Sequence, residues 1–63
     1  MQEYIITDGV DYLSRIITFK DGMEGYHFTG DRKEALRFTD MMQAANTCFK
    51  MAKKGMAMYA EEA

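Results

Sequence analysis

Three segments in the first half of the chain are rich in β-branched and aromatic residues, a composition typical of strands. They span residues 4–7, 12–19 and 26–29. The pairs Asp8-Gly9 and Asp21-Gly22 separate them, and Asp-Gly favours a two-residue hairpin turn because both central residues need positive φ. The pattern therefore predicts a three-stranded antiparallel meander.

These turns also predict which strand residues face the core. Two-residue turns would pair Thr7 with Val10 and Lys20 with Met23. Since successive strand residues point to opposite faces, one face collects the predicted core residues Tyr4, Leu13, Ile17, Phe19, Tyr26 and Phe28, with Arg15 on the same face near its rim. The other apolar residues that would point the opposite way are Ile5, Tyr12 and Ile16. Either that second face is partly covered or a β-bulge shifts the register.

The second half of the chain has the spacing of one amphipathic helix. Thr39 or Asp40 is the candidate N-cap, and Gly55 is a natural residue to end the helix. The apolar residues that recur at helical spacing are Met41, Ala45, Cys48, Phe49 and Ala52. Met42 and Met51 flank this stripe and widen it to about 180°, beyond the ~100° that is typical of a helix facing a core.

Shorter elements connect and follow these segments. Asp31 is expected to cap a helical turn over residues 32–35, and residues 36–38 to form an extended link or edge strand. Residues 56–59 would form a short last strand or extend over the core, and residues 61–62 a solvated tail. We thus predict a single α+β domain over residues 1–63, a three-stranded antiparallel meander with one amphipathic helix packed on it and room for a short fourth strand.

Length and cysteine content limit how this domain is stabilised. A chain of 63 residues buries only about 60% of its unfolded surface, so small domains commonly add disulfides, a metal or a partner subunit. Cys48 is the single cysteine, which excludes an intramolecular disulfide, and with His27 as the one histidine the supply of metal ligands is poor. We expect oligomerisation or an unusually complete core instead, with no cofactor and no metal.

Charge and hydropathy narrow the range of partners. The net charge is −2 with both signs mixed along the chain, unlike the basic bias of a double-stranded nucleic-acid binder or the dense acidity of a DNA mimic. No apolar run approaches the ~20 residues of a membrane helix, and no N-terminal stretch has the pattern of a signal peptide. Together with the lone cysteine, these features predict a cytoplasmic protein without membrane contact.

No motif for catalysis is evident. Cys48 and His27 are the only candidate cysteine nucleophile and base. Cys48 lies on the apolar stripe, where a free cysteine behaves as a small apolar residue, and His27 is expected at a strand surface. The carboxylates near the turns lack calcium-loop spacing and are explained by turn chemistry: Asp8, Asp11, Asp21 and Glu24. We therefore predict no enzyme activity and no small-molecule substrate.

Methionine is the compositional feature with a functional interpretation. Five of the six methionines beyond Met1 lie in the helix and the C-terminal segment. Methionine fills gaps in cores and is also common on adaptable binding surfaces. Two interpretations therefore stay open: core packing, or a protein-binding patch formed by Met42, Met51, Met56 and Met58.

A second function class is a weak binder of single-stranded nucleic acid. Aromatic side chains on a sheet, with basic neighbours, hold unpaired bases by stacking. The candidate residues for such a face are Tyr12, Arg15, Lys20, His27 and Arg37. The sequence motif of the common RNA-binding sheets is missing, so protein binding is the preferred prediction.

The stretch FTGDRKEALRFTD at residues 28–40 leads into an alanine-rich helix and follows an N-terminal Tyr-Ile-Ile strand. This pattern resembles small uncharacterised phage and prophage proteins built from a sheet and one helix. The resemblance implies an origin in a mobile element and carries no functional residues over; Met41-Met42 stand where the pattern usually has acidic residues. We expect a non-enzymatic accessory module that binds a host protein or a second copy of itself, through the methionine-rich helix flank or by strand addition.

Overall fold

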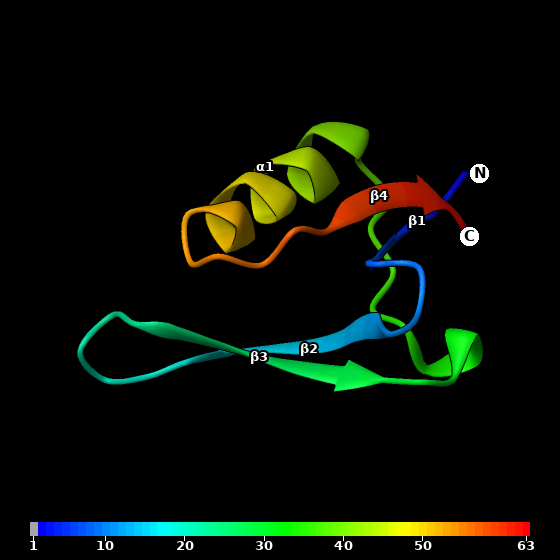
Figure 1. Ribbon diagram of the computed structural model, residues 1–63. Helices are drawn as coiled ribbons and strands as arrows, with labels where there is room; N and C mark the ends of the chain where they lie inside the picture. The colour runs from blue at the N-terminus through cyan, green and yellow to red at the C-terminus, as the bar shows by residue number, and fades with distance from the viewer. Residues whose placement is uncertain (1) are drawn as a thin grey trace.

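Four strands, one α-helix and one 3₁₀ helix make up the computed structural model, which describes residues 2–63 (Figure 1). In chain order they are β1 (Tyr4–Thr7), β2 (Tyr12–Thr18), β3 (Glu24–Thr29), η1 (Arg32–Glu34), α1 (Met41–Ala52) and β4 (Tyr59–Glu62). Neighbouring strands are antiparallel, in the order β3-β2-β1-β4. The predicted α+β class is confirmed, and a fourth strand extends the meander beside β1.

The four strands fall into two halves. β1 pairs with β4 along its whole length, and β2 pairs with β3 as a long hairpin, whereas β1 meets β2 at the Thr7–Tyr12 pair. α1 packs against β1 and β4, and Figure 1 shows the β2–β3 hairpin extending below this layer. The helix therefore covers the β1–β4 half of the sheet rather than the predicted meander as a whole.

The first turn is longer than predicted, because side chains organise it. Thr7 pairs with Tyr12, not with Val10. The Asp8 carboxylate accepts hydrogen bonds from the backbone N–H of Val10 at 2.9 Å and of Asp11 at 2.8 Å. The Thr7 hydroxyl donates to the Asp11 carbonyl at 2.7 Å. These bonds stabilise a four-residue connection over residues 8–11, so the two-residue turn predicted here is wrong.

The second turn is also longer, by one residue. The Phe19 N–H donates to the Met23 carbonyl at 2.8 Å, and the Gly22 N–H donates to the Phe19 carbonyl at 3.0 Å. Gly22 has φ 85°, the left-handed conformation that ends a three-residue hairpin loop. Met23 therefore lies opposite Phe19, not opposite Lys20 as predicted.

A β-bulge at Ser14 changes which side chains of β2 face the core. The register shifts between Leu13 and Arg15, which leaves Ser14 as the extra residue, and its hydroxyl donates to the His27 carbonyl at 3.0 Å. Leu13 and Ile16 consequently both reach the core. The bulge left open by the sequence is therefore confirmed on β2, and a covered second face is found on β1, where Ile5 is fully buried on the side opposite to Ile6.

The bulge and the longer turns correct the predicted core. Leu13, Tyr4 and Tyr26 contribute to it as expected. The predicted core residues that lie outside the buried cluster are Ile17, Phe19 and Phe28. The apolar residues that were predicted to point away but are buried or packed on the core are Ile5 and Ile16. The one-residue shift at Ser14 reverses the faces of Ile16 and Ile17. Ile5 needs a different explanation: it points away from Tyr4 and Ile6 as predicted, and it is buried because that second face of β1 is covered.

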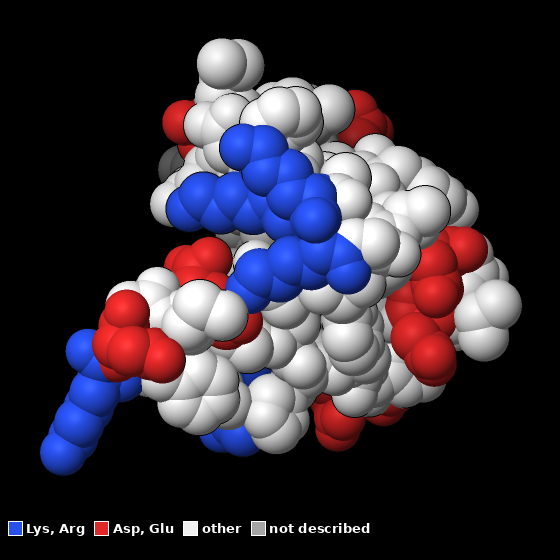
Figure 2. Space-filling model, turned by 60° about the vertical axis from the view of Figure 1, so that its left-hand side comes forward, with Lys and Arg blue, Asp and Glu red and all other residues white. Residues whose placement is uncertain are grey.

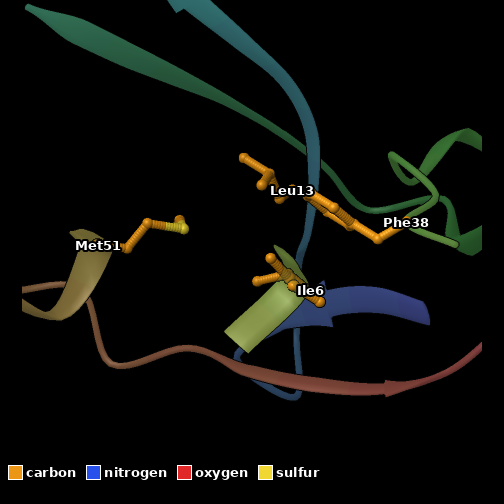
Figure 3. Close-up of a cluster of buried hydrophobic side chains, with 5 residues drawn as sticks. Ile6, Leu13, Phe38 and Met51 are labelled. Atoms are coloured by element: carbon orange, nitrogen blue, oxygen red, sulfur yellow. The ribbon is translucent and has the colours of Figure 1, made fainter. Parts of the chain in front are cut away.

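The main core joins all parts of the chain. It consists of Ile6, Leu13, Phe38, Ala44 and Met51, drawn in Figure 3. Phe38 enters it because the extended link bridges to β1: the Tyr4 N–H donates to the Phe38 carbonyl at 2.7 Å. Asp31 caps η1 as predicted, by accepting from the Lys33 N–H at 2.9 Å.

Of the two alternatives predicted for residues 56–59, the structure shows extension over the core, with the last strand beginning at Tyr59. Met56 and Met58 extend over the core, and β4 follows at Tyr59–Glu62. Glu61 and Glu62 are thus strand residues rather than a solvated tail. Their pairing with β1 places Ala60 opposite Ile6, on the side of the core.

Candidate protein-binding surface

The ends of α1 form as the sequence predicts and fix the helix in place. Asp40 is the N-cap, and its carboxylate accepts from the Met42 N–H at 2.9 Å. Gly55 has φ 85°, and the following Met56 N–H donates to the Met51 carbonyl at 3.0 Å. These contacts determine the residues at which α1 begins and ends.

One face of α1 lies in the core. Ala44 and Met51 are fully buried, and Cys48 is half-buried against the same cluster. Figure 3 shows the Met51 side chain pointing from α1 towards Ile6 and Leu13. Spacings of four and three residues place these side chains on one side of the helix. The predicted stripe is therefore wrong in phase: Met41, Ala45, Phe49 and Ala52 are exposed, and Cys48 is the member that packs on the core.

A second apolar face of α1 is open to solvent. We call it the outer seam and define it as Met42, Ala45, Phe49 and Ala52. Met42 is 68% exposed and Phe49 is 63% exposed. Met41, at 49%, borders the seam on the side of the core. Large apolar side chains this exposed, about two helical turns apart on one face with Ala45 between them, form a patch of the kind that marks protein interfaces.

Lysines border the outer seam at the C-terminal end of α1. Lys50, Lys53 and Lys54 are all exposed, and Figure 2 shows basic side chains gathered over one end of the molecule. The Lys53 ammonium lies 4.7 Å from the centre of the Phe49 ring. Lys54 turns away from the seam, since its ammonium donates to the Glu24 carbonyl at 2.8 Å. Lys50 and Lys53 thus give the edge of the seam a positive charge.

The methionines predicted to bind a partner divide between two environments. Met42 is exposed, whereas Met51 is fully buried, so Met51 belongs to the core interpretation that the sequence left open. Met56 and Met58 are half-buried against the core. The four residues therefore do not form one exposed patch. The exposed apolar partner of Met42 is Phe49, which sequence reasoning assigned to the core.

Met56 and Met58 also line an open groove of about 440 Å³ between the first turn and β3. Phe28 forms part of its wall, with Asp8 and Asp11 at one end. The backbone N–H groups of Asp11 and Val10 lower the pKa of the Asp8 carboxyl, so it is ionised at neutral pH. The bonds that lower this pKa are the ones that hold the turn together, which confirms the turn chemistry predicted for Asp8.

Three of the five residues predicted for nucleic-acid binding share one face of the β2–β3 hairpin. Arg15 and His27 are directly opposite each other and exposed. Tyr12 pairs with Thr29, two residues from His27 on β3, so it points the same way. The other two candidates lie elsewhere: Lys20 in the second turn, and Arg37 in the extended link, 3.4 Å from Glu3.

The candidate catalytic pair is not brought together. Cys48 packs against the core, where burial raises the pKa of its thiol and favours the unreactive neutral form. His27 is exposed on the hairpin face opposite to that of Tyr26, which packs on the core. Within residues 2–63, no group of three or more His, Cys, Asp and Glu side chains is arranged to hold a metal ion.

On each edge strand of the sheet, a basic side chain donates a hydrogen bond to a backbone carbonyl that points away from the sheet. Lys54 donates to the Glu24 carbonyl of β3, and Arg32 donates to the Glu62 carbonyl of β4 at 2.8 Å. Along an antiparallel edge strand, the backbone N–H and C=O groups of every second residue point away from the neighbouring strand. The register places the Glu24 and Glu62 carbonyls among these outward groups, on the free edges of the sheet. Charged side chains at such positions hinder the addition of another strand.

Among the described residues, no helix combines the length and the apolar character needed to cross a bilayer. Comparison of the chain with protein-family models, with curated proteins and with solved structures found no match.

Proposed function

We propose that this chain is a non-enzymatic protein-binding module and that the outer seam of α1 is its docking surface. The observation that carries the proposal is the exposure of Met42 and Phe49 on a helix whose opposite face already supplies the core. Full burial of a large apolar side chain contributes about 1.5–3 kcal/mol. Covering these two side chains would therefore supply a substantial part of a binding free energy.

The lysines at the seam determine what kind of partner fits. Lys50 and Lys53 are exposed beside Phe49 and have no carboxylate partner within salt-bridge distance in the described part of the chain. A partner with apolar side chains in the centre and an acidic group opposite the basic end of the seam matches this arrangement. Strand addition fits less well, because Lys54 and Arg32 occupy outward carbonyls on the two sheet edges.

The biological setting of this module is proposed from the sequence resemblance alone. A phage or prophage accessory protein that acts on a host protein in the cytoplasm agrees with the resemblance of residues 28–40 and with the small size of the chain. Contact with another protein is the means of action that the outer seam offers to such a module.

Site-specific photo-crosslinking tests the docking surface. A photoreactive phenylalanine analogue is placed at Phe49 or, as the matched control, at Phe19, which is 55% exposed on the hairpin. We expect discrete protein adducts from position 49 and none from position 19, because only the seam is a docking surface. Equal labelling from both positions, or none from position 49, would contradict the proposal.

The hairpin face supports a second candidate, binding of single-stranded nucleic acid. The directly opposed Arg15 and His27, with Tyr12 on the same face, offer a basic and aromatic surface. We expect the affinity for a short single strand to fall steeply as salt rises, and Arg15→Ala to weaken binding at low salt. Unchanged fluorescence anisotropy of a labelled oligonucleotide at low salt would remove this candidate.

A further inference from the structure

The outer seam has the spacing of a coiled-coil interface. Its residues Met42, Ala45, Phe49 and Ala52 are separated by three, four and three positions, which is the alternation of a and d positions in a heptad. Such a narrow seam matches another helix better than a flat surface. Along the seam large and small residues alternate, so the matching helix needs small and large residues in the opposite order.

We propose that the occupant of the outer seam is the same seam of a second copy of this chain, with the two α1 helices antiparallel; this inference rests on the proposed docking function of the seam. In this arrangement Ala45 faces Phe49 of the second copy, and Met42 faces Ala52 of the second copy. From its N-terminal end the seam has residues in the order large, small, large, small, and from its C-terminal end in the order small, large, small, large. Each large side chain therefore packs against a small one, as interdigitating layers require.

The antiparallel direction follows from the same residues. In a parallel pair Phe49 would meet Phe49, and Ala45 would meet Ala45, which gives a crowded layer next to an empty one. A parallel pair would also bring the exposed Lys53 of both copies to the same end. In the antiparallel pair the two Lys53 side chains lie at opposite ends, and the end of the seam that carries Lys53 is next to Asp40, the N-cap of the second copy's helix.

The expected dimer is weak. α1 has 12 residues, so the helix contact is smaller than the roughly 1,200 Å² that stable interfaces bury. Self-association should therefore depend on concentration and be seen only where the chain is concentrated. A contact of this strength also allows exchange between the second copy and another protein that presents a similar helix.

Sedimentation equilibrium over roughly a hundredfold range of concentration tests the pairing. Because Ala45 faces Phe49, we expect A45F to overfill the layer and F49A to leave a gap. Each change should weaken association by about tenfold or more, since it occurs twice in the dimer. The double variant A45F/F49A restores one large and one small residue in each layer and should recover most of the affinity.

The controls distinguish this specific pairing from unfolding of the variants and from nonspecific hydrophobic association. Ala45 and Phe49 are exposed, so far-UV circular dichroism of all three variants should match that of the parent chain. Phe19→Ala, on the hairpin, should leave association unchanged. A double variant that stays as weak as the single ones would overturn the antiparallel layer.

The outcome also distinguishes this inference from the proposed function. A parent chain that is monomeric at every concentration overturns self-pairing. If position 49 still crosslinks to a different protein, the docking function stands while the second copy is excluded as its occupant. If neither self-pairing nor crosslinking is found, both proposals fail together.

Discussion

Met51 and Met42 lie on the same helix and have opposite surroundings. Met51 is 0% exposed and packs between α1 and the strands, whereas Met42 is 68% exposed on the outer seam. The two faces of α1 are about equally apolar, so composition does not distinguish them. What differs is the surface that each face meets: β1 and β4 on one side, and solvent on the other. An apolar face is thus evidence for contact, but not for contact within the same chain.

The largest expected effect separates the two methionines. Met51→Ala should lower the free energy of unfolding by about 2–5 kcal/mol, because it removes a fully buried side chain and leaves a cavity. Met42→Ala should change it by less than about 0.5 kcal/mol. Urea denaturation followed by circular dichroism measures both. Similar losses for the two variants would mean that the faces do not differ as described.

Enlarging Ala44 and Ala45 compares the buried and the exposed face of α1 by adding side-chain volume instead of removing it. Ala44 is fully buried and Ala45 is exposed. Ala44→Leu should destabilise the fold by about 1–3 kcal/mol, since a packed core does not accept extra methylene groups without strain. Ala45→Leu should be close to neutral in a dilute, monomeric sample. A stabilised Ala44→Leu protein would show that the core under α1 is loosely filled.

The N-cap residue affects the buried face and the outer seam of α1 equally, because it determines where the helix begins. Asp40→Ala removes the carboxylate that accepts from the Met42 N–H and should cost about 1 kcal/mol. Asp40→Asn keeps an acceptor oxygen and should retain most of the stability. Thermal unfolding at neutral pH compares the two. The cap would have no role if Asp40→Ala unfolded at the parent temperature.

Cys48 lies at the boundary of the two faces and gives the smallest effect. Burial raises the pKa of its thiol, so the folded state favours the neutral form. The stabilisation is present below the pKa of the unfolded thiol and is lost as pH rises through the folded pKa. Native chain should react with a thiol reagent only at higher pH than unfolded chain does.

Cys48→Ala is the control for this pH dependence. It should lose less stability between neutral and alkaline pH than the parent chain, since no thiol remains to ionise. Reaction of native Cys48 with the same pH midpoint as the unfolded chain would mean that the thiol is not shielded by the core.

Local chemistry predicted the elements better than it predicted their pairing. β1 and the positions of the caps at Asp31 and Asp40 follow from residues next to one another in the chain, and they form as expected. The turns do not, although both contain Asp-Gly. The side chains of Thr7 and Asp8 extend the first turn through hydrogen bonds to backbone groups of residues 10 and 11, and Gly22 closes the second as a three-residue loop. Asp-Gly signals a turn without giving its length.

The candidate surface shows the same division. The sequence contained the apolar residues of α1 and indicated that their stripe was wider than a core needs. It placed Phe49 on the core stripe and left Met51 open between core and binding patch, whereas the structure exposes Phe49 and buries Met51. Helical spacing is set by the backbone hydrogen bonds, so it can be read from the chain. The rotation of the helix on the sheet depends on which side chains fit against Ile6 and Leu13.

By itself, then, the amino-acid sequence determined an α+β chain with capped helical segments, the approximate positions of the first three strands and more apolar helix surface than one core uses. Only the tertiary structure decided the register of the strands, the pairing of β4 with β1 and the face of α1 that stays in solvent. The physical reason is the sequence separation of the interacting residues. Caps and helical spacing depend on contacts a few residues apart, whereas a bulge or a helix rotation depends on packing between segments distant in the chain.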